Sequence, residues 1–210
     1  MNKKSHIVFT KKMNIEVPSR CHVGLLVGSV LPDILVHTYL MGHTWKASGA
    51  MILNKLEKLE QSDSLNIWTV LRLGMILHYI EDFFTMSHSR FFQGNLLEHI
   101  GYEMRLQRYI QATFNRRYKL YDKDVENTQI YSMNDLKERM VSLQTEYEKE
   151  IKEAAGDEVL CFQTDLEYMN IAVQTVAGYL IPALNRKSIL YCKIENGTLV
   201  RIFSGVSHLT

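Results

Sequence analysis

Five residues between positions 78 and 103 combine metal-binding side chains with the spacing of a helix face. His78 and Asp82 are four residues apart, as are His99 and Glu103, so each pair shares one face of a helix. His88 lies between the two pairs. Imidazole nitrogens and carboxylate oxygens are the ligands that zinc accepts where thiolates are absent. We therefore predict a multinuclear zinc site carried on two facing helices.

The residues around the first pair indicate that its polar side chains are buried. In the stretch 77–84, His78 and Asp82 stand on an otherwise apolar helix, where an ionised carboxylate is very costly unless it is paired or bound to metal. Glu81 does not share their face, and we expect it to be paired or solvated. Either pair alone is weak evidence, because such spacings often arise by chance. The ordered set from 78 to 103 is far less often accidental.

Composition narrows the class of protein. The 210 residues are 46% hydrophobic and 22% charged, as expected for a soluble globular protein. The net charge of +1 gives no general affinity for nucleic acids. Three cysteines without a CxxC spacing argue against a disulfide framework and against a thiolate zinc site. Seven of the eight histidines lie within the first 99 residues, so the site is expected in the N-terminal half.

Helical periodicity dominates the chain, and we predict an all-α bundle in which residues 1–210 form one domain. A metal-site half (1–117) is followed by supporting helices (132–184) and a tail (185–210). The expected helices cover 19–31, 46–61, 64–86 and 95–117, and two more begin with capping boxes at Ser132 and Thr164. Pro182 is expected to end or kink the last helix. Asn196-Gly197 predicts a short β-hairpin in the tail.

Residues 78–88 resemble the core signature of the zinc-dependent phospholipase C family. That family is related to the fungal single-strand-specific nucleases, and both are all-helical with a trinuclear zinc cluster. Residues 28–33 are similar to the family's Gly-x-x-x-Pro-Asp element, whose aspartate binds zinc. His43 and His6 are similar to two further histidine ligands. The resemblance covers residues 4–103.

The resemblance implies ligands at eight positions. A first zinc would be held by Asp33, His43 and His78, and a second by His88, His99 and Glu103. Asp82 would bridge the first zinc to a third, which His6 would complete.

Two points of this assignment stay open. His37 is an alternative to His43, because it lies four residues after Asp33 and could share a helical face with it. In secreted members a processed N-terminal tryptophan gives its amino group and carbonyl to the third zinc, whereas this chain begins Met1-Asn2-Lys3. Two zinc ions are therefore expected, and the third site is left undecided.

Clustered zinc ions lower the pKa of a bound water towards about 7 and stabilise the oxygens of an in-line displacement at phosphorus. We therefore expect a zinc-dependent phosphoesterase in which Asp33 and Glu103 also assist proton transfer. The resemblance implies a phospholipid substrate, and another phosphoester or a single-stranded nucleic acid is also open. The alternative is a metal-stabilised binding or scaffold protein. The helical HD phosphohydrolases are set aside, because the chain has no His-Asp dipeptide.

Neither apolar stretch near the N-terminus has the length of a targeting or membrane-spanning segment. Residues 7–9 form the whole apolar body of the basic N-terminus, whereas a signal peptide needs roughly 7–15 apolar residues. Residues 23–36 contain Pro32 and Asp33 and are shorter than the roughly 20 residues of a membrane span. We therefore expect a cytoplasmic protein without a transmembrane segment. Its oligomeric state is not indicated.

Overall fold

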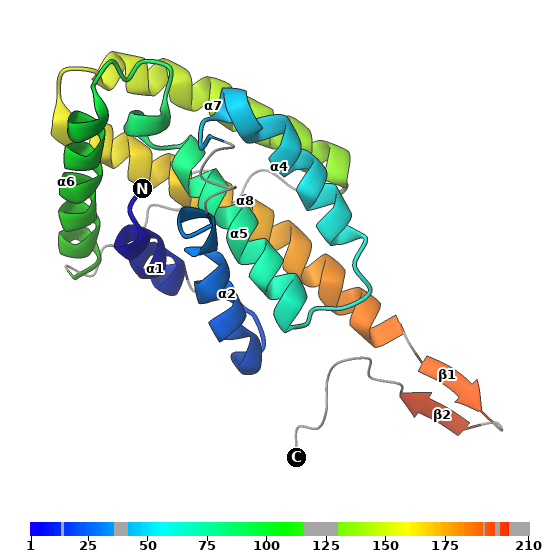
Figure 1. Ribbon diagram of the computed structural model, residues 1–210. Coiled ribbons are helices and arrows are strands. Elements are labelled where there is room, and N and C mark those ends of the chain that lie inside the picture. Colours follow the sequence, from blue (N-terminus) through cyan, green and yellow to red (C-terminus); the bar gives the residue numbers. More distant parts are fainter. Residues whose placement is uncertain (14, 36–41, 116–129, 191, 196–197, 202–210) are drawn as a thin grey trace.

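A computed structural model describes residues 1–13, 15–35, 42–115, 130–190, 192–195 and 198–201. Apart from two short strands, its regular elements are helices, which confirms the all-α prediction. Helix α5 (Ile67–Phe83) runs through the middle and packs against α2 (His22–Gly28), α4 (Trp45–Glu60) and α8 (Glu158–Leu190), as Figure 1 shows. Because α5 carries His78 and Asp82, the first predicted pair lies in the core of the bundle.

The chain starts with a helix that periodicity did not predict, α1 (Lys3–Lys12). Asn2 caps it, because its side-chain oxygen accepts a hydrogen bond from the Ser5 amide at 3.1 Å. The buried face of α1 includes His6 and Thr10, so it shows no apolar stripe in the sequence. It packs against α2 and α6 (Leu96–Asn115), which places the start of the chain beside the predicted site.

The single helix predicted over 19–31 is wrong, because the structure divides this region into three pieces. A 3-10 turn, η1 (Ser19–Cys21), leads into α2, and a second 3-10 turn, η2 (Leu31–Asp33), follows. Pro32 lies inside η2 rather than closing a helix. Proline lacks an amide hydrogen and disfavours helical geometry in the preceding residue, so the α-helix ends earlier, at Gly28.

Helices α2 and α5 approach each other more closely than ordinary side chains allow. A Cβ added to Gly28 would lie 2.2 Å from a backbone oxygen of α5, and one added to Gly74 would lie 2.4 Å from a backbone oxygen of α2. Both positions therefore require glycine. The close approach lets Nδ1 of His78 lie 2.9 Å from the backbone oxygen of Ser29. The segment that carries Asp33 is thereby held against α5.

His43 lies at the entrance to α4, which agrees with the helix predicted over 46–61. Thr44 is the N-cap and accepts a hydrogen bond from the Ala47 amide at 3.2 Å. The preceding Gly42 has a φ of 74°, which glycine adopts without strain. Ser48 donates a hydrogen bond to the Gly42 carbonyl at 3.0 Å, which fixes this turn.

The helix predicted over 64–86 is observed as α5 followed by the 3-10 turn η3 (Met86–His88). Asn66 caps α5 through the amides of Trp68 and Thr69. As predicted, Asn95 caps α6, which runs to Asn115, and Glu98 accepts a hydrogen bond from the Asn95 amide. Residues 116–129, between α6 and the supporting helices, lie outside the described residues.

The supporting helices are α7 (Met133–Ala154) and α8. The capping box predicted at Ser132 and Asp135 is present. The start predicted at Thr164 is wrong: α8 begins at Glu158, where Asp157 accepts hydrogen bonds from two amides of the first turn. Pro182 lies inside α8 and does not end it. Gly156 has a φ of 112° and forms the turn between the two helices.

The predicted hairpin is confirmed by two antiparallel strands, β1 (Cys192–Glu195) and β2 (Thr198–Arg201). In register, Glu195 pairs with Thr198 across the turn. No helix in the described ranges is both long enough and apolar enough to span a bilayer.

Candidate metal centre

All eight predicted ligand residues lie in three adjoining groups of potential metal donors. Within each group the donor atoms lie within 4.8 Å of one another. The groups are Asp33, His43 and His78; His88, His99 and Glu103; and His6, His78 and Asp82. The competing His37 lies outside the described residues. The residues come from α1, η2, the α4 entrance, α5, η3 and α6, so six separate segments meet here.

The first group has the spacing of atoms around one ion. Nε2 of His78 lies 3.4 Å from Nδ1 of His43 and 3.6 Å from Oδ1 of Asp33, and the last two atoms are 4.0 Å apart. Ligand atoms about 2.0–2.1 Å from a tetrahedral zinc ion lie about 3.3 Å from one another. The donor set and its spacing therefore fit zinc.

The second group lies where η3 meets α6. Oε1 of Glu103 is 3.2 Å from Nε2 of His88 and 3.0 Å from Nε2 of His99. His99 and Glu103 share one face of α6, as their i,i+4 spacing predicts, and His88 lies at the end of the adjacent turn η3. These separations again suit a single ion.

Asp82 occupies the centre, between the other two groups. Its Oδ2 is 2.8 Å from Nδ1 of His43 and 3.3 Å from Nε2 of His78. Its Oδ1 is 3.4 Å from Nε2 of His6 and 3.7 Å from Nε2 of His88. Among the described residues, the buried Nε2 of His6 has no hydrogen-bond partner, as expected of an atom that ligates a metal. The two carboxylate oxygens thus face different sets of imidazoles.

Two ligand imidazoles are oriented through their other ring nitrogen. Nδ1 of His78 donates to the Ser29 carbonyl at 2.9 Å, and Nδ1 of His6 donates to Oε2 of Glu81 at 2.5 Å. Such contacts fix the tautomer and leave Nε2 for the metal. The sequence interpretation expected Glu81 to be paired or solvated. In the structure Glu81 is fully buried and is paired with His6 of α1. The sequence did not indicate this partner, because the two residues are far apart in the chain.

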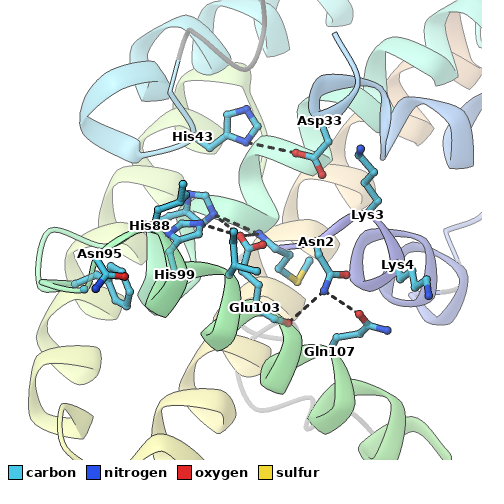
Figure 2. Close-up of a pocket in the computed structure, with 15 residues that line it drawn as sticks. Asn2, Lys3, Lys4, Asp33, His43, His88, Asn95, His99, Glu103 and Gln107 are labelled. Atoms are coloured by element: carbon cyan, nitrogen blue, oxygen red, sulfur yellow. Dashed lines mark hydrogen bonds and ion pairs between the residues drawn. The ribbon is translucent and has the colours of Figure 1, made fainter. Parts of the chain in front are cut away.

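The α-amino group of Met1 lies among the three donor groups. The sequence analysis did not assign a place to this amino group. It forms a buried ion pair with Asp82, and it lies 3.3 Å from Oε1 of Glu103 and 3.4 Å from Nε2 of His88. Asn2 donates a hydrogen bond to Oε1 of Gln107 at 2.8 Å and so ties the start of the chain to α6 (Figure 2). The amino group therefore lies next to the donors of the third group.

Positive charge gathers around Asp82. Burial opposes ionisation of this carboxylate, but the Met1 amino group and three imidazoles outweigh burial and hold the pKa of Asp82 well below its usual value. Burial also opposes protonation of His6, yet Asp82 and Glu81 raise its pKa to about 9. For the Met1 amino group, Asp82 and Glu103 similarly overcome burial and raise the pKa to about 10. Bound metal ions would replace these protons with fixed positive charge.

A further buried carboxylate, Asp165, was missed by the sequence interpretation. Its oxygens accept hydrogen bonds from the hydroxyls of Tyr102 at 2.7 Å and Tyr147 at 2.8 Å, and from the Met86 amide at 3.1 Å. These contacts join α8 to α6, α7 and η3. Burial raises the pKa of Asp165 to about 7, although the three donors oppose the shift. The sequence did contain a signal for this carboxylate, because Asp165 is an acidic residue on the buried face of a mainly apolar helix.

Residues of the first and second groups line an open cleft of about 820 Å³ (Figure 2), whereas His6 and Asp82 of the third group do not line it. His6, His78 and Asp82 are fully buried, whereas Asp33, His99 and Glu103 are partly exposed. The cleft is lined by five of the predicted ligand residues: Asp33, His43, His88, His99 and Glu103. A small molecule entering the cleft therefore meets the outer two groups first.

The zinc-dependent phospholipase C family matches residues 20–154, which is more than half of the chain. The match includes every predicted ligand except His6. No curated protein and no solved structure matches the chain. The matched range also contains α2, α4, α5 and α6. The chain therefore belongs to the zinc-dependent phospholipase C family.

Proposed function

We propose that this protein is a zinc-dependent phosphoesterase that hydrolyses a phosphodiester. The observation that carries the proposal is the convergence of three nitrogen- and oxygen-donor groups, two of which line an open cleft. Membership of a zinc-dependent hydrolase family supports the same chemistry.

Each donor group is assigned one zinc ion. Asp33, His43 and His78 would hold the first, and His88, His99 and Glu103 the second. His6 and Asp82 would hold the third, with the Met1 amino group beside them. The outer two groups combine histidine with carboxylate and leave room on the cleft side, which is typical of catalytic zinc rather than of a closed structural site.

Zinc bound by such groups acidifies a coordinated water and stabilises charge on phosphoryl oxygens. The chain's own contribution is proton transfer at the edge of the cleft. Burial raises the pKa of Asp33, whereas the Met1 amino group, His88 and His99 outweigh burial and lower that of Glu103. Oε1 of Glu103 lies 3.2 Å from Nε2 of His88 and 3.0 Å from Nε2 of His99, so Glu103 is assigned to binding and Asp33, at the edge of the cleft, to this step.

The reaction adds one water across a phosphorus–oxygen bond. The water oxygen bonds to phosphorus, and the bond from phosphorus to the leaving alcohol oxygen breaks. Asp33 accepts the proton from the attacking water and returns it to the alcohol oxygen, so the carboxylate is regenerated.

The test pairs zinc content with hydrolysis of bis(p-nitrophenyl) phosphate. We expect wild-type protein purified without added zinc to keep at least two ions per chain. His78→Ala and His99→Ala should each lose zinc and reduce kcat/KM by at least about 100-fold. His22→Ala is the matched control, since His22 bonds only to the Val17 carbonyl, at 3.0 Å, outside the donor groups.

Two results would contradict the proposal. A content of fewer than one tightly bound zinc ion per chain would show that the proposed metal site does not exist. Two bound ions with no cleavage of bis(p-nitrophenyl) phosphate, phospholipid or single-stranded DNA would support the scaffold alternative.

The role of the Met1 amino group is tested by adding Gly-Ser before Met1. The extension removes the free amine from the cluster and forces two residues into a buried space. We expect loss of the third zinc and retention of the other two, measured by zinc content after desalting.

A further inference from the structure

The cleft above the metal centre has two unlike walls. One wall is the first turn of α1, with Lys3 and Lys4. The other runs from Phe92 into the first turns of α6 and is mainly apolar. Figure 2 shows the two lysines on one side of Glu103 and Asn95, the cap of α6, on the other. A bound molecule would therefore span a cationic and an apolar surface.

The cationic wall is not neutralised within the described part of the chain. Lys3 and Lys4 are exposed, and no described acidic side chain forms an ion pair with either. The acidic residues that line the cleft are Asp33 and Glu103, and both belong to the donor groups. With those carboxylates committed to cations, the cleft attracts negative charge beyond that of one phosphodiester.

The apolar wall continues onto an exposed stripe of α6, which we call the α6 ridge. Its members recur at helical spacing and are all aliphatic: Leu96, Leu97, Ile100 and Met104. Leu97 is 79% exposed, which is unusual for a large apolar side chain next to a cleft. Flexible aliphatic side chains suit acyl chains, whereas nucleic-acid bases stack on aromatic rings. Apart from the imidazoles, Phe92 provides the one aromatic ring among the described lining residues.

The described residues that line the cleft do not include the groups that recognise a quaternary ammonium. Such cations are held by cages of several aromatic rings or by free carboxylates. Among the described lining residues, Phe92 provides the single aromatic ring that is not an imidazole, and neither acid lies outside the donor groups. A choline headgroup would therefore face two lysines without a compensating partner.

We propose that the substrate is an anionic phospholipid whose headgroup carries negative charge beyond the scissile phosphodiester. The headgroup contacts Lys3 and Lys4, and the acyl chains lie along the α6 ridge. This inference rests on the proposed function and adds the charge class of the substrate. Lys3 and Lys4 are specificity residues, because they contact the headgroup rather than the reacting atoms.

The test compares zinc-loaded protein on phosphatidylglycerol and phosphatidylcholine with identical acyl chains, in neutral-detergent mixed micelles. We expect kcat/KM to be at least about 10-fold higher for phosphatidylglycerol, since each lysine near an anionic lipid contributes about a factor of five. The Lys3→Glu/Lys4→Glu variant should lose this preference through KM. The Lys11→Glu/Lys12→Glu variant makes the same charge change in the last turn of α1 and should keep it.

The α6 ridge is tested separately by vesicle sedimentation, which needs no turnover. Leu97→Gln should weaken binding to phosphatidylglycerol vesicles, whereas Trp68→Gln should not. Trp68 is similarly exposed, at 70%, but lies in the first turn of α5, far along that helix from Asp82.

Four results would overturn the inference: equal rates on the two lipids, a preference for phosphatidylcholine, an equal effect of both lysine pairs, or cleavage of single-stranded DNA in place of lipid. Failure of the proposed function has a different signature, namely no hydrolysis of bis(p-nitrophenyl) phosphate. Binding to phosphatidylglycerol over phosphatidylcholine vesicles still tests the charge class in that case, and equal binding would reject it.

Discussion

Asp82 and Asp165 are both fully buried carboxylates, and their surroundings differ in kind. Asp82 faces imidazole nitrogens from four segments and the Met1 amino group, which together form the Asp82 cluster. Asp165 faces two tyrosine hydroxyls and a backbone amide, which form the Asp165 cluster. The pKa of Asp82 is held well below its usual value, whereas that of Asp165 is raised by burial to about 7.

The difference lies in what the neighbouring atoms can do. The two oxygens of Asp165 accept hydrogen bonds from hydroxyl and amide hydrogens. These neighbours therefore do not offer further ligand atoms to a metal ion. The imidazole nitrogens that face Asp82 carry lone pairs when they are neutral. Lone pairs on neighbouring nitrogen and oxygen atoms repel one another unless a cation lies between them. A buried carboxylate therefore indicates a metal site only when its neighbours are themselves metal ligands.

The two clusters are mechanically connected. Met86, which donates to Asp165, stands two residues before His88, and Tyr102 stands next to Glu103. The Asp165 cluster thus fixes the backbone of η3 and α6, both of which carry candidate ligands. Asp165 is a positioning residue for the second donor group.

The largest expected effect separates the two aspartates directly. Asp82→Asn should lose at least one zinc per chain and lower kcat for bis(p-nitrophenyl) phosphate by more than about 100-fold, because the central bridging carboxylate is gone. Asp165→Asn should keep the full zinc content at saturating zinc. Zinc analysis after desalting checks both, and equal zinc loss in the two variants would break the comparison.

The next effect concerns the close packing that supports the Asp82 cluster. Gly74→Ala places a methyl group against the backbone of α2 and should lower the free energy of unfolding by about 1–3 kcal/mol. Gly178→Ala in α8 meets nothing within 4 Å and should raise it by up to about 1 kcal/mol. Urea denaturation of zinc-free protein measures both changes, and a neutral Gly74→Ala would contradict the role given to this contact.

A smaller effect separates the two tyrosines of the Asp165 cluster. Tyr102→Phe and Tyr147→Phe should each cost about 1–3 kcal/mol of stability, because a buried oxygen loses a donor. Tyr102→Phe should also weaken zinc at the second donor group by about 10-fold, because Tyr102 precedes Glu103. Competition with a chelator measures the affinity. Equal affinity changes in the two variants would show that the cluster acts only through overall stability.

The last effect is a pH dependence of stability from Asp165. Its folded pKa of about 7 exceeds the usual value of 3.8, so the folded protein holds one proton more than the unfolded chain between these values. Stability from this group therefore decreases as pH rises from about 4 to about 7, by up to about 1.4 kcal/mol per unit. Urea denaturation of zinc-free wild type and Asp165→Asn between pH 5 and 8 isolates this slope. A difference that does not change with pH would contradict it.

Much of the fold was predictable because it depends on local signals. The capping residues Asn95 and Ser132 and the hairpin turn were identified from sequence, since each acts within a few residues. The helix start predicted at Thr164 failed, because a capping-box spacing inside a longer helix carries no information about packing. Helix α1 was missed, because its buried face includes the polar residues His6 and Thr10 and so shows no apolar stripe in the sequence.

For the site, the sequence by itself determined which residues can bind metal. The i,i+4 pairs at 78–82 and 99–103 follow from helix geometry alone. The resemblance implied the bridging place of Asp82, but only the tertiary structure decided that Glu81 orients His6, that the Met1 amino group contacts Asp82, and that Asp165 contacts Met86. The physical reason is that these contacts join residues more than 70 positions apart, through packing of helices whose relative positions no local pattern encodes.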